Sequence, residues 1–186
     1  MLKAFWGWAP NLERIWVAQL KQLKFISNEL KNCTREFGGE LLKGSRKSSR
    51  PLSSKRSLHL VLRADTAQTG SIRKFKNGIS ALLDKYSKKF GVKIYKYAIA
   101  GNHIHIVLLA PHRVQYRAWI RTFTARLSVS FKIKWAHRPW SRVLSWGREF
   151  KTVVKYVLQN ILEAEGVIAY KPRKYKTKRK LTNLQI

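Results

Sequence analysis

The chain has 186 residues, of which 39 are lysine or arginine and 9 are aspartate or glutamate, so its formal net charge is +30. Solubility does not need so large a charge, and the excess predicts a polyanionic partner, with nucleic acid ahead of an anionic membrane surface. No apolar run approaches the roughly 20 residues that span a bilayer, no signal-peptide pattern is present, and the single cysteine, Cys33, excludes an internal disulfide and cysteine-based zinc fingers.

The N-terminal part of the chain predicts one helix followed by a basic connector. Residues 11–37 have mixed apolar and polar spacing that is compatible with a helix, with Asn11 as a possible N-cap and 38-GG-39 as the stop. Residues 40–57 are rich in serine, lysine and arginine, and we interpret them as an exposed connector.

The middle of the chain predicts three strands and one long helix. The stretch 58-LHLVLRAD-65 is typical of a strand, and residues 71–91 carry an apolar stripe with helical spacing. Residues 92–100 alternate as a strand does. The pair Gly101-Asn102 then predicts a hairpin turn into a third strand over 103–110.

The last third predicts a helix over 114–133, a short strand over 139–146 and a final helix over 148–166. The resulting order, β-α-β-β-α-β-α, contains the split βαβ, ferredoxin-like arrangement. We therefore expect an α+β fold: an antiparallel sheet with helices on one face, plus the N-terminal helix and a basic C-terminal tail. The expected organisation is an extension over 1–49, a folded domain over 50–170 and a tail over 171–186.

The stretch 101-GNHIHIVLLA-110 sets two histidines into an apolar strand. Side chains alternate along a strand, so His103 and His105 share one face, while Ile104 and Ile106 share the other and can enter a core. Neutral imidazole is a common ligand of divalent metals. Two half-buried histidines satisfied by hydrogen bonds explain this strand, taken alone, equally well. His59 on the first strand could face either way.

The final helix carries a tyrosine and an amide on one side. Tyr156 and Asn160 are four residues apart and share a face, and Gln159 lies next to it. Packed on the sheet, the helix could bring a hydroxyl and an amide oxygen to the histidines. Two imidazoles and an amide oxygen suit Mg²⁺ or Mn²⁺ on a bound phosphate better than a closed zinc site. A tyrosine can then attack a phosphodiester as a nucleophile. By itself, however, Tyr156 is more simply a residue that packs on the sheet.

The two motifs 102-NHIHIVLL-109 and 156-YVLQN-160, separated by an amphipathic helix, together resemble the single-tyrosine HUH transposases, which include the REP-associated tyrosine transposases. The resemblance covers roughly residues 50–170, which would then form an HUH transposase-like catalytic domain. It implies a metal-dependent endonuclease that cleaves and rejoins single-stranded DNA through a 5′-phosphotyrosine and recognises DNA hairpins.

The resemblance also implies roles for individual residues. Tyr156 would take the 5′ phosphate and release a 3′ hydroxyl, and the metal ligands would be His103, His105 and Asn160. Asn160 stands where many relatives have glutamine, and Gln159 is the substitute if the register slips. Ile161 follows the amide where relatives often have proline.

Other functions fit the sequence less well. A carboxylate-triad nuclease lacks a carboxylate cluster near the histidines, and an RNA-associated basic protein leaves the histidine and tyrosine motifs unexplained. A non-catalytic, domesticated DNA-binding protein on the same fold is the main alternative. We expect a cytoplasmic, nucleoid-associated protein without a membrane partner. The sequence leaves monomer and homodimer open.

Overall fold

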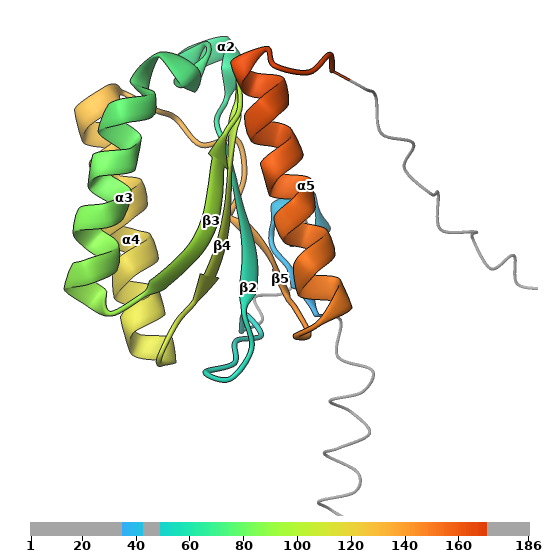
Figure 1. The fold of residues 1–186 in the computed structure, drawn as a ribbon. Coiled ribbons are helices and arrows are strands. Elements are labelled where there is room, and N and C mark those ends of the chain that lie inside the picture. Colours follow the sequence, from blue (N-terminus) through green and yellow to red (C-terminus); the bar gives the residue numbers. More distant parts are fainter. Residues whose placement is uncertain (1–34, 43–48, 171–186) are drawn as a thin grey trace, which may run out of the picture. The chain divides into compact units, whose positions relative to one another are not determined.

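The computed structural model describes residues 35–42 and 49–170, and the chain divides into two units, residues 1–36 and 37–186. The second unit carries the sheet and helices that concern the candidate site (Figure 1). The strands are β1 (Glu36–Phe37), β2 (Leu58–Arg63), β3 (Lys93–Ile99), β4 (His103–Leu109) and β5 (Trp140–Val143). The long helices are α3 (Lys76–Phe90), α4 (Arg113–Phe131) and α5 (Arg148–Glu165), and the short ones are η1 (Gly39–Leu42), α2 (Thr66–Thr69) and η2 (Ile72–Phe75).

The strands form one sheet in the order β1-β5-β2-β4-β3. Strand β4 pairs antiparallel with β2 and β3, and β2 pairs antiparallel with β5. The order β5-β2-β4-β3, with α3 after β2 and α4 after β4, is that of the predicted ferredoxin-like unit. The α+β fold class is therefore confirmed. Each element predicted between residues 58 and 166 is present, with bounds shifted by a few residues.

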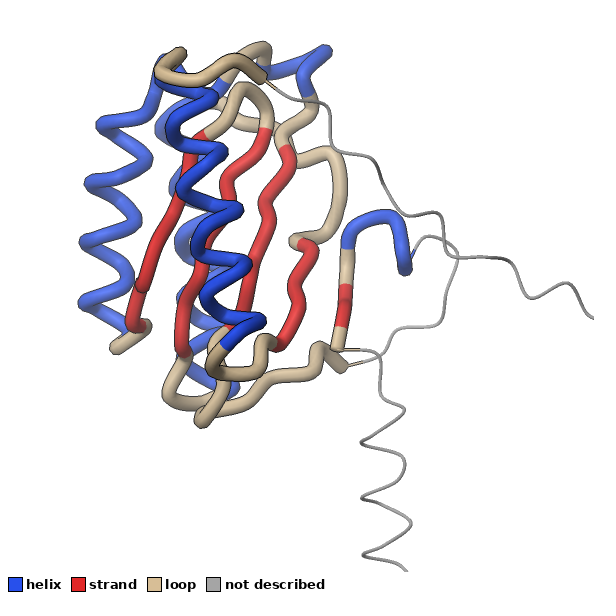
Figure 2. Tube along the Cα trace, turned by 45° about the vertical axis from the view of Figure 1, so that its right-hand side comes forward, coloured by secondary structure: helices blue, strands red, loops and turns tan. Residues whose placement is uncertain are grey.

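The alternation of side chains along β4 separates two layers. Ile104 and Ile106 are fully buried in the larger core, which α3 and α4 complete. His105 and Val107 point to the other face, where Val107 packs with Val157 of α5 in a smaller cluster. Figure 2 shows the strands lying between the helices of the two faces.

The sequence placed the helices on one face of the sheet. The two helices of the split βαβ unit do lie together, and the structure adds α5 on the opposite face (Figure 1). The reason is an apolar stripe on α5 that covers the smaller cluster, formed by Val153, Val157 and Ile161. The side of the sheet that carries the histidines is thereby closed by a helix.

The helix predicted over 11–37 is wrong at its end, because Glu36–Phe37 form strand β1; residues 11–34 lie outside the described residues. Gly38 does not stop a helix. It has a φ of 89°, and a Cβ there would lie 2.1 Å from the carbonyl oxygen of Pro139. Only glycine fits this close approach to the residue that precedes β5.

The connector predicted over 40–57 is not exposed throughout. Arg50 is half-buried: its Nη2 donates to the carbonyl oxygen of Pro139 (2.7 Å), and its Nη1 donates to the Ser141 hydroxyl. Ser57 is fully buried. A guanidinium that is partly buried needs hydrogen-bond acceptors in place of water. Ser141 of β5 and Pro139 just before it supply them. The predicted tail over 171–186 lies outside the described residues, and among those described, no helix combines the length and apolarity that a membrane crossing requires.

Candidate active site on the sheet face under α5

Strand β4 places His103 and His105 side by side on the face that α5 covers. Their ring centroids lie 4.6 Å apart and the rings are nearly perpendicular, at 88°. His105 is 4% exposed and stands opposite Ala98 on β3, whose short side chain leaves room for an imidazole. His103, at the start of the strand, is half-buried. The two histidines thus share a face, as the alternation of the strand predicts.

Helix α5 brings Tyr156 to the same place. Its ring centroid lies 5.2 Å from that of His105, at 88°, so the two rings meet edge to face. Tyr156 also packs against the small apolar cluster under α5, so it both contacts the sheet and adjoins the histidines. At the start of the helix, Oε2 of Glu149 accepts a hydrogen bond from the backbone nitrogen of Ser145 (2.8 Å), and a carboxylate in the first turn is favoured by the helix dipole.

The two amides on α5 differ in their surroundings. Asn160 lies one turn beyond Tyr156, is 5% exposed, and its Nδ2 donates to the carbonyl oxygen of Tyr156 (2.7 Å). Gln159 is half-buried, and its Nε2 donates to Oε1 of Glu163 along the helix (2.7 Å). Of the two, Asn160 is the more deeply buried side chain. Its contribution as a ligand stays a prediction.

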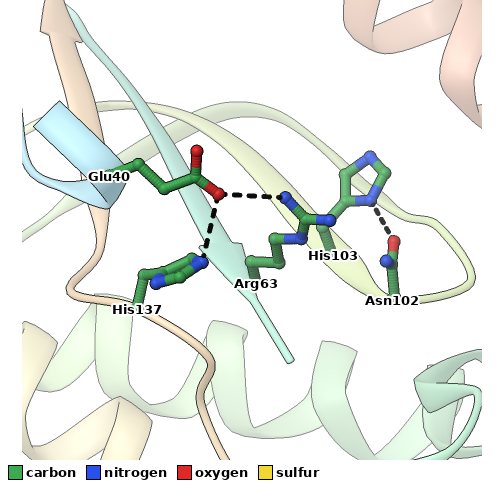
Figure 3. Close-up of polar contacts among 5 residues, drawn as sticks. All are labelled: Glu40, Arg63, Asn102, His103 and His137. Atoms are coloured by element: carbon green, nitrogen blue, oxygen red, sulfur yellow. Dashed lines mark hydrogen bonds and ion pairs between the residues drawn. The ribbon is translucent and has the colours of Figure 1, made fainter. Parts of the chain in front are cut away.

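Asn102, in the turn before β4, fixes the tautomer of His103. The ring Nδ1 of His103 lies 2.6 Å from Oδ1 of Asn102 (Figure 3). An amide oxygen only accepts, so the hydrogen is on Nδ1. A neutral His103 therefore carries its ring lone pair on Nε2, the atom that a metal would bind.

His59 of β2 is a member of the site that the sequence left undecided. It is 7% exposed, its Nε2 lies 3.2 Å from Nδ1 of His105, and its ring meets Tyr156 at 6.1 Å between centroids. Burial lowers the pKa of His59 from 6.5 to about 4, and the positive charge of Arg142 adds to the effect. His59 is therefore neutral at pH 7. The sequence contains one signal for its position. His59 alternates with Leu58, Leu60 and Leu62, which lie in the larger core, so His59 points to the opposite face of the sheet.

Basic residues border the site. Arg63 on β2 is the cross-strand neighbour of His103. Figure 3 shows Glu40 between Arg63 and His137, at 4.0 Å and 3.4 Å from their nitrogens. Exposed pairs of this kind contribute about 0–1 kcal/mol. Arg63 can therefore exchange Glu40 for a phosphate at small cost.

The donor set fits a divalent cation bound partly by its substrate. Among the described residues, no group of three or more histidine, cysteine, aspartate or glutamate side chains is arranged to hold a metal. The Nδ1 atoms of both histidines are in hydrogen-bond contacts, which leaves Nε2 of each ring as the nitrogen that could bind a metal. Two imidazoles and the Asn160 amide oxygen would make an open Mg²⁺ or Mn²⁺ site that phosphate oxygens complete.

The fold resembles that of a solved transposase. One solved structure, the REP-associated tyrosine transposase bound to a REP hairpin, has a TM-score of 0.52 and 13% sequence identity and covers 66% of this chain and 76% of that chain. A candidate transposase from Deinococcus radiodurans R1 has a TM-score of 0.35 and 13% identity, with 62% of this chain and 97% of that chain covered. No curated protein matches the chain.

The family model described as transposase IS200 like matches residues 53–163, which is more than half of the 186 residues. The matched segment runs from before β2 into the last turn of α5 and includes the histidine strand and Tyr156. This chain belongs to the family of IS200-like transposases.

Proposed function

We propose that this transposase cleaves and rejoins single-stranded DNA through a 5′-phosphotyrosine on Tyr156, with a divalent cation held by His103, His105 and Asn160. The observation that supports this is the meeting of three rings from two elements, β4 and α5: His103 and His105 lie 4.6 Å apart, and His105 and Tyr156 lie 5.2 Å apart. A packing residue alone would not require a tyrosine against paired histidines.

The chain's residues perform the reaction as follows. The phenolic oxygen of Tyr156 attacks the scissile phosphorus, its proton passes to solvent, and an oxygen–phosphorus bond to the tyrosine forms. The bond to the 3′ oxygen breaks, and that oxygen takes a proton and leaves as a hydroxyl. A bound Mg²⁺ or Mn²⁺ would supply polarisation of the phosphate. Rejoining is the reverse attack by a 3′ hydroxyl, so the bond energy is conserved and no nucleotide cofactor is consumed.

The surroundings of the site suit a polyanionic substrate. Arg63 is exposed beside His103, and Lys155 is exposed next to Tyr156. Such residues position a phosphate backbone without reading its sequence. The related solved structure is bound to a REP hairpin. We therefore propose hairpin-bearing single-stranded DNA as the substrate of this chain.

The test is a denaturing-gel assay with end-labelled hairpin oligonucleotides taken from the DNA that flanks the gene, with Mn²⁺ or Mg²⁺. We expect a protein–DNA adduct that survives denaturation and is lost in Tyr156→Phe, which retains DNA binding. The matched control is Tyr170→Phe, a change at a tyrosine that is 70% exposed and lies beyond α5.

Two outcomes would contradict the proposal. An adduct that persists in Tyr156→Phe would show that another residue is the nucleophile. Tight binding of these hairpins by the wild-type protein without any adduct would favour the alternative, a DNA-binding protein that has kept the fold and lost the chemistry.

A further inference from the structure

His59 is a buried histidine that the proposed reaction does not use. It reaches the site from β2, a strand on which neither the tyrosine nor a proposed ligand lies. Its ring lies 5.4 Å from that of His105 between centroids, with 22° between planes, and meets the ring of Trp140 at 5.5 Å. The two histidines share one hydrogen bond, between Nε2 of His59 and Nδ1 of His105 (3.2 Å).

That hydrogen bond has only two arrangements, because a neutral imidazole carries a single N–H. If Nε2–H of His59 donates, Nδ1 of His105 accepts, and the hydrogen of His105 sits on Nε2. That atom then has no lone pair for a metal. If Nδ1–H of His105 donates, His59 accepts, and the lone pair of His105 is on Nε2.

The neighbouring histidine favours the second arrangement. Oδ1 of Asn102 can only accept, so His103 carries its hydrogen on Nδ1. His103 and His105 are two residues apart on one face of β4, with their ring centroids 4.6 Å apart. Two such rings converge on one cation only if both have the lone pair on Nε2. An acceptor behind Nδ1 of each ring is what metal-binding histidines require.

We propose that His59 is a positioning residue: its Nε2 accepts a hydrogen bond from Nδ1–H of His105 and holds His105 in the tautomer that can bind a divalent cation. His59 thus does for His105 what Asn102 does for His103. The inference rests on the proposed function, because it gives His105 the role of a ligand. His59 itself carries its hydrogen on Nδ1 and touches neither DNA nor metal.

Two substitutions at His59 separate the effect of its hydrogen-bond acceptor from the effect of the space that its ring fills. His59→Gln places an amide oxygen near the position of Nε2 and keeps the acceptor. His59→Leu fills part of the same buried space without one. His112→Leu, at an exposed histidine that precedes α4, is the control. Circular dichroism and thermal unfolding identify the variants that fold.

Two measurements on the full chain decide the matter. The first is a long-range ¹⁵N–¹H spectrum of the histidine rings in protein stripped of metal. We expect the hydrogen of His105 on Nδ1 in wild type and His59→Gln, and partly on Nε2 in His59→Leu. The second is calorimetric titration with Mn²⁺ in the absence of DNA. We expect affinity to fall about 10- to 100-fold in His59→Leu and to recover in His59→Gln.

The inference is overturned if wild-type His105 carries its hydrogen on Nε2, or if folded His59→Leu binds Mn²⁺ as tightly as wild type. Should His59→Leu not fold, the wild-type spectrum and His59→Gln still decide. His103→Ala and His105→Ala test the proposed function separately. If they bind Mn²⁺ normally, the metal site is wrong, whatever tautomer His105 has.

Discussion

Asn160 and Gln159 are adjacent on α5, and their surroundings predict different effects of substitution. Asn160 is buried, and its amide nitrogen is bonded to the helix backbone, whereas the half-buried Gln159 amide is bonded to the Glu163 carboxylate. We expect Asn160→Ala to lose metal-dependent adduct formation on hairpin DNA and Gln159→Ala to keep it, because an amide oxygen completes the ligand set. The denaturing gel, run across a Mn²⁺ titration, measures both.

The reverse result, loss in Gln159→Ala and retention in Asn160→Ala, would assign the ligand to Gln159 and require α5 to turn on its axis. Urea unfolding of the two variants is the control, since Asn160→Ala also removes a hydrogen bond to the carbonyl oxygen of Tyr156.

A second residue-scale prediction concerns pH and the stability of the protein without metal. The pKa of His59 is about 4 in the folded protein, where the ring is buried, and 6.5 in the unfolded chain, where it is exposed to water. Between pH 6.5 and pH 4, His59 is protonated in the unfolded chain but not in the folded protein. The free energy of unfolding is therefore highest above pH 6.5 and decreases as the pH falls toward 4. The linkage relation gives a loss of about 2 kcal/mol between pH 7.5 and pH 5.

Urea unfolding in EDTA at these two pH values, compared between wild type and His59→Gln, measures that loss. We expect the variant to lose about 2 kcal/mol less than wild type over this range. If wild type and His59→Gln lose the same free energy of unfolding, folding does not lower the pKa of His59. Its contact with His105 would then be arranged differently.

The residues of the site were predictable to the extent that they lie in one local pattern. His103 and His105 alternate with Ile104, so their common face follows from the strand alone. Tyr156 and Asn160 share a helix face for a similar reason. His59 contacts His105 only because β2 pairs with β4 in one particular register, which links residues 46 apart in the chain. Local periodicity does not contain that register.

At the scale of elements, the packing of α3 on α4 depends on the absence of a side chain. A Cβ at Gly78 would lie 2.4 Å from a ring atom of Phe131, which itself stacks on Phe75 at 4.9 Å. Alanine favours a helix over glycine by about 1 kcal/mol, whereas overpacking costs about 1–3 kcal/mol. We expect Gly78→Ala to lower the free energy of unfolding by about 1 kcal/mol.

The matched test is the same change in a Phe131→Leu background, where the smaller side chain removes the clash. There Gly78→Ala should stabilise the protein, so the double-mutant cycle changes sign. Stabilisation by Gly78→Ala alone would mean that the ring of Phe131 moves away without cost. Adduct formation should be unaffected in each case, because α3 and α4 cover the face opposite the histidines.

Elements were predictable where their own periodicity decides them, as in α3 or in the strand with the two histidines. The segment around Gly38 and Arg50 was not, because its conformation comes from contacts with residues 139–141 about a hundred positions later. A serine- and arginine-rich composition is typical of an exposed connector. The segment itself contains no signal that Arg50 finds hydrogen-bond acceptors at Pro139 and Ser141. The position of α5 on the second face likewise depends on the small cluster beneath it.

At the scale of the whole molecule, the charge of +30 leads us to expect DNA affinity that falls steeply with salt. Each phosphate neutralised by a lysine or arginine releases a counterion, so the logarithm of affinity falls linearly with the logarithm of salt concentration, by about 0.7 per contact on a single strand. A protein that makes six to ten phosphate contacts on duplex DNA loses about 10³- to 10⁵-fold in affinity when salt rises from 50 to 200 mM.

The C-terminal segment allows this charge to be separated from the chemistry. Residues 171–180 read KPRKYKTKRK, in which seven of ten residues are lysine or arginine, and the family match ends at residue 163. We expect a chain ending at residue 170 to show a salt slope smaller by up to about 5, from seven contacts at 0.7 each. Fluorescence anisotropy of a labelled hairpin, in the Tyr156→Phe background so that no adduct forms, gives the slope.

The same truncation with Tyr156 intact should still form the adduct at low salt, because His103, His105 and Tyr156 all lie within 53–163. Replacing the seven basic residues by glutamine at full length is the control for length, and it should reproduce the smaller slope. An unchanged slope would place the DNA wholly on residues before 171. Loss of the adduct at low salt would instead give these residues a part in the chemistry, because a contact that serves only affinity can be compensated by raising the concentration of DNA.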